Sequence, residues 1–276
     1  MQTTATVIEH SISPVGKQIL TLQVTYPRFI HGELLTHRVF SRNAMSSRAI
    51  PVAKMVEQVR NDPAMPVYWG ANQPGMQASA ELSDTTEARQ SWCRAARQAA
   101  DVAEHLNAIG LHKQIANRVL EPFQWMRTLI TATEWGNFFE LRMHPDAQPE
   151  FQHLAKLMFQ EVANSTPVER FYTGPNSWHL PYVSDAERAI YREDVLLKLS
   201  TARCARVSYL THDGENPDIA KDIELYQRLV GSTPIHASPC EHQAQPLMSG
   251  MERSRNFVGW KQHRESVERN LKEAAC

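Results

Sequence analysis

The stretch that decides the fold runs Thr36-His37-Arg38-Val39-Phe40-Ser41-Arg42-Asn43-Ala44-Met45-Ser46-Ser47-Arg48. It holds three arginines, one histidine, four hydroxyl side chains and one amide, and it contains no acid. An exposed helix usually carries acids that pair with its basic residues. Arginines without acidic partners are suited to binding anions from outside the chain, and phosphates are the commonest of these. The stretch therefore predicts a site for a phosphate-bearing ligand, with a solvated helix end as the alternative interpretation.

The composition limits what kind of protein this is. A chain of 276 residues, 42% of them hydrophobic, can bury one large core, so we expect a single domain over residues 1–276. The formal net charge is −1, whereas proteins that bind nucleic acid polymers through backbone phosphates are usually basic. No apolar run of about 18 residues is present, so no membrane-spanning helix is expected. The expected partners are small molecules.

The N-terminus and the cysteines bear on location. The first residues lack the basic and apolar regions of a secretion signal. The four cysteines form no C-x-x-C pair. We therefore expect reduced thiols and a cytoplasmic location.

Periodicity predicts an α/β chain in which helices dominate and strands are few. Apolar and β-branched residues alternate over 18–26, which predicts a strand. Apolar residues at spacings of three and four predict helices over the following ranges: 87–109, 149–162, 217–230 and 265–275. Prolines and glycines make 61–80 a long irregular loop, either an exposed connection or a lid over a site. The arginine-rich stretch reads as a helix, or as a helix followed by a loop.

A second segment with possible chemistry lies between residues 137 and 148. Arg142 follows an aromatic pair there, and an arginine among apolar residues needs a partner. Glu140 or Asp146 could serve, and so could a ligand phosphate or a pyrimidine carbonyl. Upstream, Arg118 precedes a segment that ends at a proline.

A third segment reads His236-Ala237-Ser238-Pro239-Cys240-Glu241-His242. Its side chains include zinc-ligand types, but the spacing fits no common metal site, and we expect no metal. Cys240, close to two histidines, could also be a nucleophile. The segment Ala205-Arg206-Val207-Ser208-Tyr209 means little by itself.

Taken together, these segments resemble the flavin-dependent thymidylate synthase family. Its H-R-x-x-S-x-N-x-x-S-x-R signature is matched by His37, Arg38, Ser41, Asn43, Ser46 and Arg48. Its F-x-x-L-R segment and the A-Q that follows are matched by Phe138, Leu141, Arg142, Ala147 and Gln148. Its A-R-V-S-Y segment is matched at 205–209, and its H-x-S/T-P-x-E-H segment at 236–242. Four matches in one chain are far more specific than any one of them.

The order of these segments differs from the family pattern. In the family, the A-R-V-S-Y and H-x-S-P-x-E-H segments precede the signature, and here they follow it, as in a circular permutation. Thr36 stands where the family has an arginine, and Ala44 where it has an acid, so the pyrimidine pocket is expected to be remodelled. Cys240 stands at a usually aromatic position, which favours a packing role.

The resemblance implies a helix-rich fold around a small, mainly antiparallel sheet, with sites at the subunit interfaces of a homotetramer. It implies that NADPH reduces FAD and that a one-carbon unit passes from 5,10-methylenetetrahydrofolate to C5 of deoxyuridylate, giving thymidylate. FAD would be bound by His37, Arg38, Asn43, Asn137, His236, Ser238 and Glu241. The nucleotide would be held by Ser46, Arg48, Arg118 and Arg142. Arg142 would also be catalytic, because it could stabilise negative charge on the pyrimidine ring.

Two alternatives stay open. The same fold could act on deoxycytidylate or make a 5-hydroxymethyl nucleotide. A different class is a non-catalytic nucleotide-binding protein that keeps only the fold. Flavin colour in the purified protein distinguishes this last class from the enzyme.

Overall fold

The computed structural model describes residues 1–174, 176–209 and 218–274. At its centre is a five-stranded sheet in the order β3-β4-β2-β1-β5. The strands are β1 (Thr4–Ile12), β2 (Gln18–Pro27), β3 (Ser41–Ala44), β4 (Trp125–Ala132) and β5 (Val168–Glu169). Every neighbouring pair is antiparallel except β1 with β5. The predicted strand at 18–26 and the small, mainly antiparallel sheet are confirmed.

Helices surround this sheet, as expected for a helix-rich α/β chain. The α-helices are α1 (His31–Leu34), α2 (Val52–Asn61), α3 (Thr86–Ala108), α4 (Lys113–Ala116), α5 (Gly136–Arg142), α6 (Pro149–Asn164), α7 (Asp185–Ile190), α8 (Glu193–Arg206), α9 (Ile219–Val230) and α10 (His263–Ala274). The 3-10 helices are η1 (Arg28–Ile30), η2 (Asn117–Phe123), η3 (Val207–Tyr209) and η4 (Ser238–Glu241). Short strands β6 (Ala244–Pro246) and β9 (Trp260–Gln262) pair, as do β7 (Arg253–Ser254) and β8 (Phe257–Val258). None of the described helices is both long enough and apolar enough to cross a membrane.

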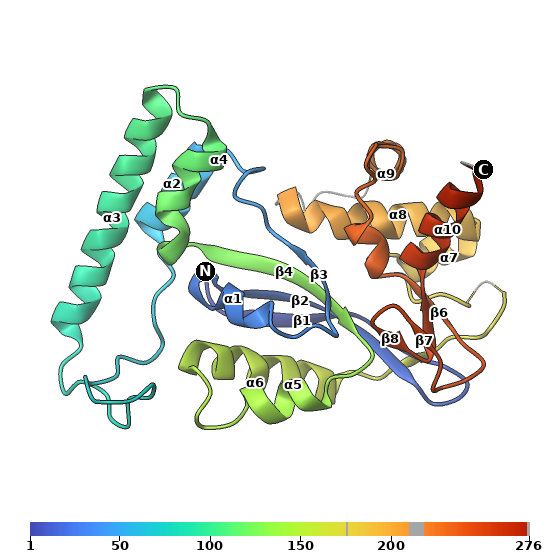
Figure 1. The fold of residues 1–276 in the computed structure, drawn as a ribbon, viewed down its shortest axis with the longest axis horizontal. Coiled ribbons are helices and arrows are strands. Elements are labelled where there is room, and N and C mark those ends of the chain that lie inside the picture. The colour runs from blue at the N-terminus through green and yellow to red at the C-terminus, as the bar shows by residue number, and fades with distance from the viewer. Residues whose placement is uncertain (175, 210–217, 275–276) are drawn as a thin grey trace.

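The main core lies between the sheet and the helices that pack on it, with α5 and α6 along one face and α2 and α3 at one end (Figure 1). Alternate residues of β2, such as Leu22 and Val24, pack there against Phe151 and Leu154 of α6. Helix α6 begins at Pro149, and the Gln148 side chain accepts a hydrogen bond from the Phe151 amide. Its predicted position and buried face are confirmed.

Helices α2 and α3 stand at one end of the sheet (Figure 1). Helix α3 is confirmed within a residue of the expected range, and Gly110 follows it with a φ of 87°, as a glycine stop requires. The long loop between α2 and α3 is irregular, as expected. Within it, a bridge between Gly70 and Glu81 makes residues 69–82 a short hairpin.

The C-terminal part, from α7 to α10, stands at the other end of the sheet (Figure 1). Helix α9 begins after Asp218, whose side chain accepts from the Lys221 amide. Pro217, at which the predicted helix range begins, lies outside the described residues. The buried residues of α9 are Asp222, Leu225 and Leu229. The apolar residues at helical spacing, Ile219, Ile223, Tyr226 and Val230, are only half-buried.

The arginine-rich stretch is not a helix beyond α1, which corrects the sequence interpretation. Residues 41–44 form β3, which pairs with β4 in the register Arg42↔Ile130, and the Met45 amide donates to the Arg127 carbonyl at 2.8 Å. Ser41 and Asn43 are buried, while Arg42 is half-buried. These residues form a strand because the edge of β4 offers backbone hydrogen-bond partners. A short polar sequence by itself does not indicate such a strand.

Candidate functional site

A cavity of about 510 Å³ lies beside β3 and collects many of the predicted ligand-binding residues. Those that line it are Asn43, Ser46, Arg48, His236 and Ser238. Its remaining walls are Arg42, Ala44, Ala49, Ala205, Ser208, Leu229 and Pro239. Residues of three segments that lie far apart in the sequence therefore meet at one cavity.

Direct hydrogen bonds hold these segments together. The Ser46 amide donates to the Ser208 carbonyl at 3.2 Å. The Asn43 side-chain amide donates to the Cys204 carbonyl at 3.3 Å. These two bonds hold the A-R-V-S-Y segment and the end of α8 against β3 and the residues that follow it.

The arginines of the signature have different roles. Arg42 donates to the carbonyls of Leu34, Leu35 and His37, so its guanidinium is used to hold the end of α1. Arg38 and Arg48 are exposed, and within the described part of the chain neither has a hydrogen-bond or ion-pair partner. Arg48 is therefore available to an anion in the cavity.

A second group forms around Arg142. Its Nε donates to His37 Nε2 at 2.9 Å, its Nη1 lies 3.0 Å from Glu33 Oε2, and its guanidinium stacks on the Phe151 ring at 4.6 Å. The acidic partner is Glu33 from α1, and neither of the two acids that the sequence offered as alternatives, Glu140 and Asp146, takes this place. His37 is buried, and this burial, together with the charges of Arg142 and Arg42, lowers its pKa to about 4. A neutral His37 accepts a hydrogen bond from the Nε–H of Arg142 and so fixes the guanidinium.

A cavity of about 740 Å³ opens over Arg142 and Glu33. The long loop supplies one wall of it, including Tyr68 and Met76, and Gln148 of the A-Q pair lies on another. The loop therefore forms part of the wall of a cavity in addition to connecting α2 with α3. The two groups of residues adjoin, because the His37 carbonyl accepts from Arg42 while its ring accepts from Arg142.

Five predicted residues line neither of these two cavities, namely His37 and Arg38, described above, and Glu241, Asn137 and Arg118. Glu241 pairs with Arg264, although its charge still acts on Arg42. Asn137 is exposed in the first turn of α5. Arg118 is exposed on η2 and pairs with Glu121 at 2.7 Å.

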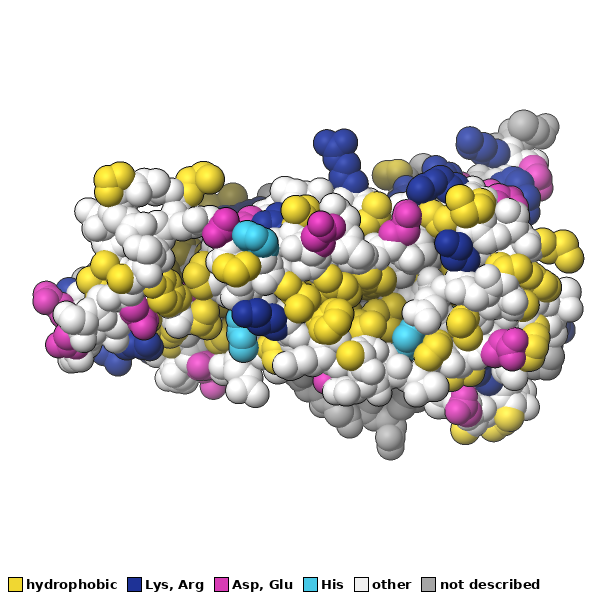
Figure 2. All heavy atoms as spheres, turned by 90° about the horizontal axis from the view of Figure 1, so that it is seen from below, with side chains coloured by type: hydrophobic (Ala, Val, Ile, Leu, Met, Phe, Trp, Pro, Cys, Tyr) yellow, Lys and Arg dark blue, Asp and Glu magenta, His cyan; other side chains and the backbone are white. Residues whose placement is uncertain are grey.

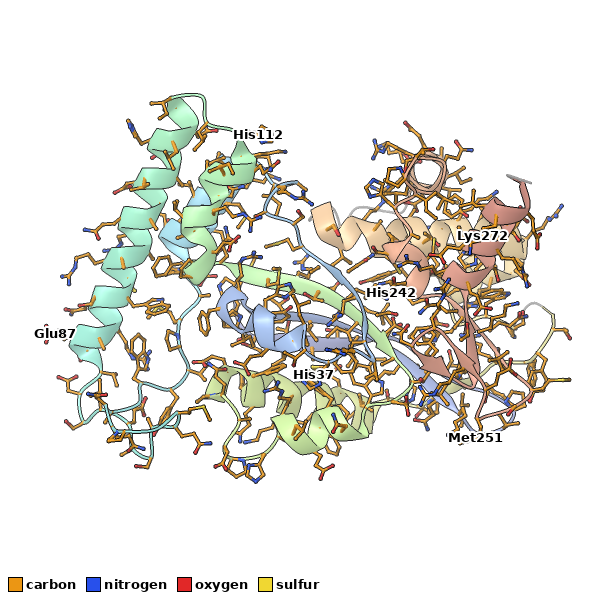
Figure 3. The ribbon with its side chains drawn as sticks, viewed as in Figure 1. His37, Glu87, His112, His242, Met251 and Lys272 are labelled. Atoms are coloured by element: carbon orange, nitrogen blue, oxygen red, sulfur yellow. The ribbon has the colours of Figure 1, made fainter. Side chains whose placement is uncertain are left out.

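Cys240 and His242 are structural residues. Cys240 is fully buried, and burial raises the pKa of its thiol to about 12, which excludes a ready nucleophile. His242 is also buried, and its Nδ1 lies 2.8 Å from Thr131 Oγ1, where β4 meets the C-terminal part (Figure 3). Among the described residues, no three ligand-type side chains are grouped as a metal would need.

Other residues that support the site could not be identified from the sequence. Glu33 was not singled out because its partner Arg142 is more than a hundred residues away. Asn256 and Gln262, from the C-terminal part, both donate to Ser41 Oγ, at 3.1 and 3.2 Å. These two residues hold β3 in place, although they belong to none of the motifs of the family.

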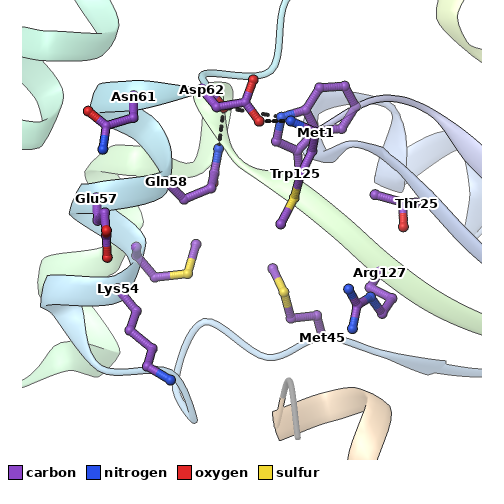
Figure 4. Close-up of a pocket in the computed structure, with 11 residues that line it drawn as sticks. Met1, Thr25, Met45, Lys54, Glu57, Gln58, Asn61, Asp62, Trp125 and Arg127 are labelled. Atoms are coloured by element: carbon purple, nitrogen blue, oxygen red, sulfur yellow. Dashed lines mark hydrogen bonds and ion pairs between the residues drawn. The ribbon is translucent and has the colours of Figure 1, made fainter. Parts of the chain in front are cut away.

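A third cavity, of about 420 Å³, lies between α2 and the sheet (Figure 4). Its walls include Met1, Met45 and Trp125, and the amino group of Met1 pairs with Asp62. None of the predicted site residues lines it.

Comparisons with known proteins bear on this site. The sequence matches the family described as "Thymidylate synthase complementing protein" over residues 5–168, more than half of the chain. Two crystal structures of the UMP/dUMP methylase PolB from Streptomyces cacaoi are similar, one bound with 5-Br dUMP (TM-score 0.46, 18% identity) and one with 5-Br UMP (TM-score 0.48, 19% identity). Each similarity covers 59% of this chain, and 90% and 89% of the methylase chains. No curated protein sequence matches the chain.

Proposed function

Because the chain belongs to the thymidylate synthase complementing protein family, we propose that it transfers a one-carbon unit to C5 of a pyrimidine deoxynucleotide with the help of FAD. The donor would be 5,10-methylenetetrahydrofolate and the reductant NADPH. Deoxyuridylate, giving thymidylate, is the acceptor that the family implies. The observation that carries the proposal is the single cavity at which Asn43, Ser46 and Arg48 meet His236 and Ser238.

The residues at that cavity fit a dinucleotide cofactor. Its volume of about 510 Å³ accommodates part of FAD, and the side-chain amide of Asn43 offers hydrogen-bonding groups on one wall. The exposed side chains of His236 and Ser238 can donate hydrogen bonds at the opposite wall. When bound, FAD supplies the hydride that completes the methyl group. The chain's own residues orient the reactants and balance their charge.

Arg142 is the residue that we assign to the pyrimidine. Its guanidinium is held by Glu33 and His37 and stacked on Phe151, so it needs little reorganisation when charge develops on the ring. Its side chain is 20% exposed, which leaves one edge open to a ligand. Ser46, Arg48 and Arg118 would hold the rest of the nucleotide, with the arginines on its phosphate.

We also propose that subunits share the site, as in the homotetramer that the family implies. Arg38, Arg118 and Asn137 are exposed and outside both cavities, so a neighbouring subunit could use them. Figure 2 shows hydrophobic side chains gathered on the face of the molecule seen from below. Leu141 and Phe159, in α5 and α6, are 53% and 45% exposed. Such a surface is typical of an interface between subunits.

A permuted chain order is a further part of the proposal. The family match ends at residue 168, while 205–209 and 236–239, which complete the cavity, follow it. Their contacts with β3 support the idea that the same site is built from segments in a different order.

The proposal is tested by incubating the full-length protein with FAD, NADPH, methylenetetrahydrofolate and either deoxyuridylate or deoxycytidylate. We expect a nucleotide heavier by one methyl group, or by one hydroxymethyl group, when the product is identified by mass. A colourless protein that binds nucleotides but forms no product with either would contradict the proposal and favour a non-catalytic nucleotide-binding protein.

A further inference from the structure

The cavity over Arg142 is shaped for a planar, uncharged group. Aromatic side chains at its walls, Phe29, Tyr68 and Trp92, offer surfaces on which a heterocycle can stack. Its volume of about 740 Å³ is ample for a nucleobase and part of its sugar. The hairpin of the long loop lies over it, where the Gln77 side chain donates to the Asp146 carbonyl at 3.1 Å.

The charges in this cavity disfavour a phosphate. Three acids line it, namely Glu33, Asp146 and Glu150, and among the described lining residues Arg142 is the one arginine or lysine. Glu150 is buried and accepts from the Val67 amide at 2.7 Å, which anchors the loop. Because acids outnumber the single paired arginine, a phosphate dianion would be repelled. The base end of a nucleotide is the part that can enter.

The hydrogen-bonding groups around Arg142 lie in a defined order. Nε donates to His37, Nη1 to Glu33, and Nη2 lies 3.4 Å from Thr36 Oγ1. A guanidinium has five N–H donors, so these three contacts leave two for a ligand. Stacking on Phe151 fixes its plane. A ligand therefore meets the carboxylate acceptor of Glu33 and, beside it, the Nη1 and Nη2 donors.

The order of one acceptor followed by two donors matches cytosine better than uracil. Cytosine presents an amino donor at C4, followed by two acceptors, N3 and O2. Uracil presents an acceptor, a donor and an acceptor, so its O4 would face the carboxylate of Glu33 with no proton between them. We propose that Glu33 makes this site selective for cytosine over uracil, so that deoxycytidylate is the preferred nucleotide. This inference rests on the proposed function, since it names the acceptor for the same site.

The test measures binding rather than turnover. Full-length protein saturated with FAD is titrated calorimetrically with deoxycytidylate and, separately, with deoxyuridylate. We expect deoxycytidylate to bind about tenfold or more tightly, as one good base-specific contact provides. In Glu33→Gln the preference should disappear, because a glutamine amide can turn either its oxygen or its nitrogen toward the base.

The matched control is Asp146→Asn, which removes the same charge from the same cavity without touching Arg142. It should keep the preference of the wild type. Equal or tighter binding of deoxyuridylate by the wild type would overturn the base assignment while leaving the proposed function standing. A preference that survives in Glu33→Gln would overturn the role of Glu33. Failure of both nucleotides to bind would overturn this inference and the proposed function together.

Discussion

At the scale of single residues, Arg142 has the most constrained surroundings of the proposed site. His37, Glu33 and Phe151 hold three sides of its guanidinium, and its side chain stays 20% exposed. A cation fixed in this way can act on a developing negative charge without first being ordered. Its position, rather than its charge alone, makes it the assigned catalytic residue.

Arg142→Ala should abolish turnover, a loss of about 10²–10³-fold or more, as when a preorganised donor is removed from an active site. FAD should stay bound, because Arg142 does not line the cavity that contains Arg48 and His236. Product formation and flavin absorbance after gel filtration measure the two effects.

Arg192→Ala is a suitable comparison, because Arg192 is 90% exposed and pairs only with Asp194 among the described residues. It should turn over like the wild type. Full turnover in Arg142→Ala would remove the assignment of Arg142.

The sequence indicated that Arg142 needs a partner but could not identify it. Apolar neighbours in the chain marked the arginine as unusual, and the candidate partners were two nearby acids or a group of a ligand. The true partners, Glu33 and His37, lie more than a hundred residues away in the sequence and meet Arg142 only in the folded chain.

At the scale of elements, α8 and α9 form one wall of the cavity beside β3, which we assign to FAD. They pack through small and apolar residues, and Ala205 of α8 and Leu229 of α9 also line the cavity. Between them, the buried Asp222 accepts from Arg203 Nε and Arg206 Nε, both at 2.8 Å. This ion pair fixes how the two helices meet.

Asp222→Ala should destabilise the protein by about 3–5 kcal/mol, because removing one partner leaves charged groups uncompensated in a buried place. Urea unfolding followed by circular dichroism measures the free energy of unfolding. Asp194→Ala, which removes an exposed acid on the neighbouring helix α8, should cost about 0–1 kcal/mol. Equal stability of the two variants would contradict the role of Asp222.

Long helices could be predicted from the sequence, whereas β3 could not. Helices α3 and α6 carry apolar residues at helical spacing along their length and end at recognisable caps. Strand β3 has four residues, three of them polar, so no alternation of apolar residues marks it. It is a strand because β4 offers an open edge, which is a property of the folded sheet.

At the scale of the whole molecule, folding buries histidines that must stay neutral. Burial lowers the pKa of His242 to about 3 and that of His263 to about 4. His37, on the other side of the sheet from His242 (Figure 3), has a pKa of about 4. In the unfolded chain each has a pKa of about 6.5. The unfolded state therefore binds more protons below pH 6.5, and stability falls as the pH falls from about 6.5 toward 4.

The free energy of unfolding should thus be constant above about pH 7 and decrease steadily between pH 6.5 and 5. Urea unfolding at half-unit pH intervals measures it. His263→Gln should lessen the slope in this interval, whereas His105→Gln, a change at an exposed histidine on α3, should not. Identical slopes in all three proteins would exclude buried histidines as the cause.

The convergence of distant segments was predicted only through the family resemblance. Motifs at 37–48 and 236–242 suggested one site, and the structure brings Asn43, Ser46 and Arg48 to the same cavity as His236 and Ser238. Their distance in space follows from the sheet and from the packing of α8, which no local pattern encodes. Asn137 and Arg118 remain on the surface of the single chain.

The most direct measurement is a double-mutant cycle on FAD affinity with Asn43→Ala and His236→Ala, read by quenching of flavin fluorescence. If one cavity uses both residues, each variant binds FAD about tenfold or more weakly, and the double variant departs from the sum of the two effects. Wild-type affinity in either single variant would contradict a shared cofactor site built from these two segments.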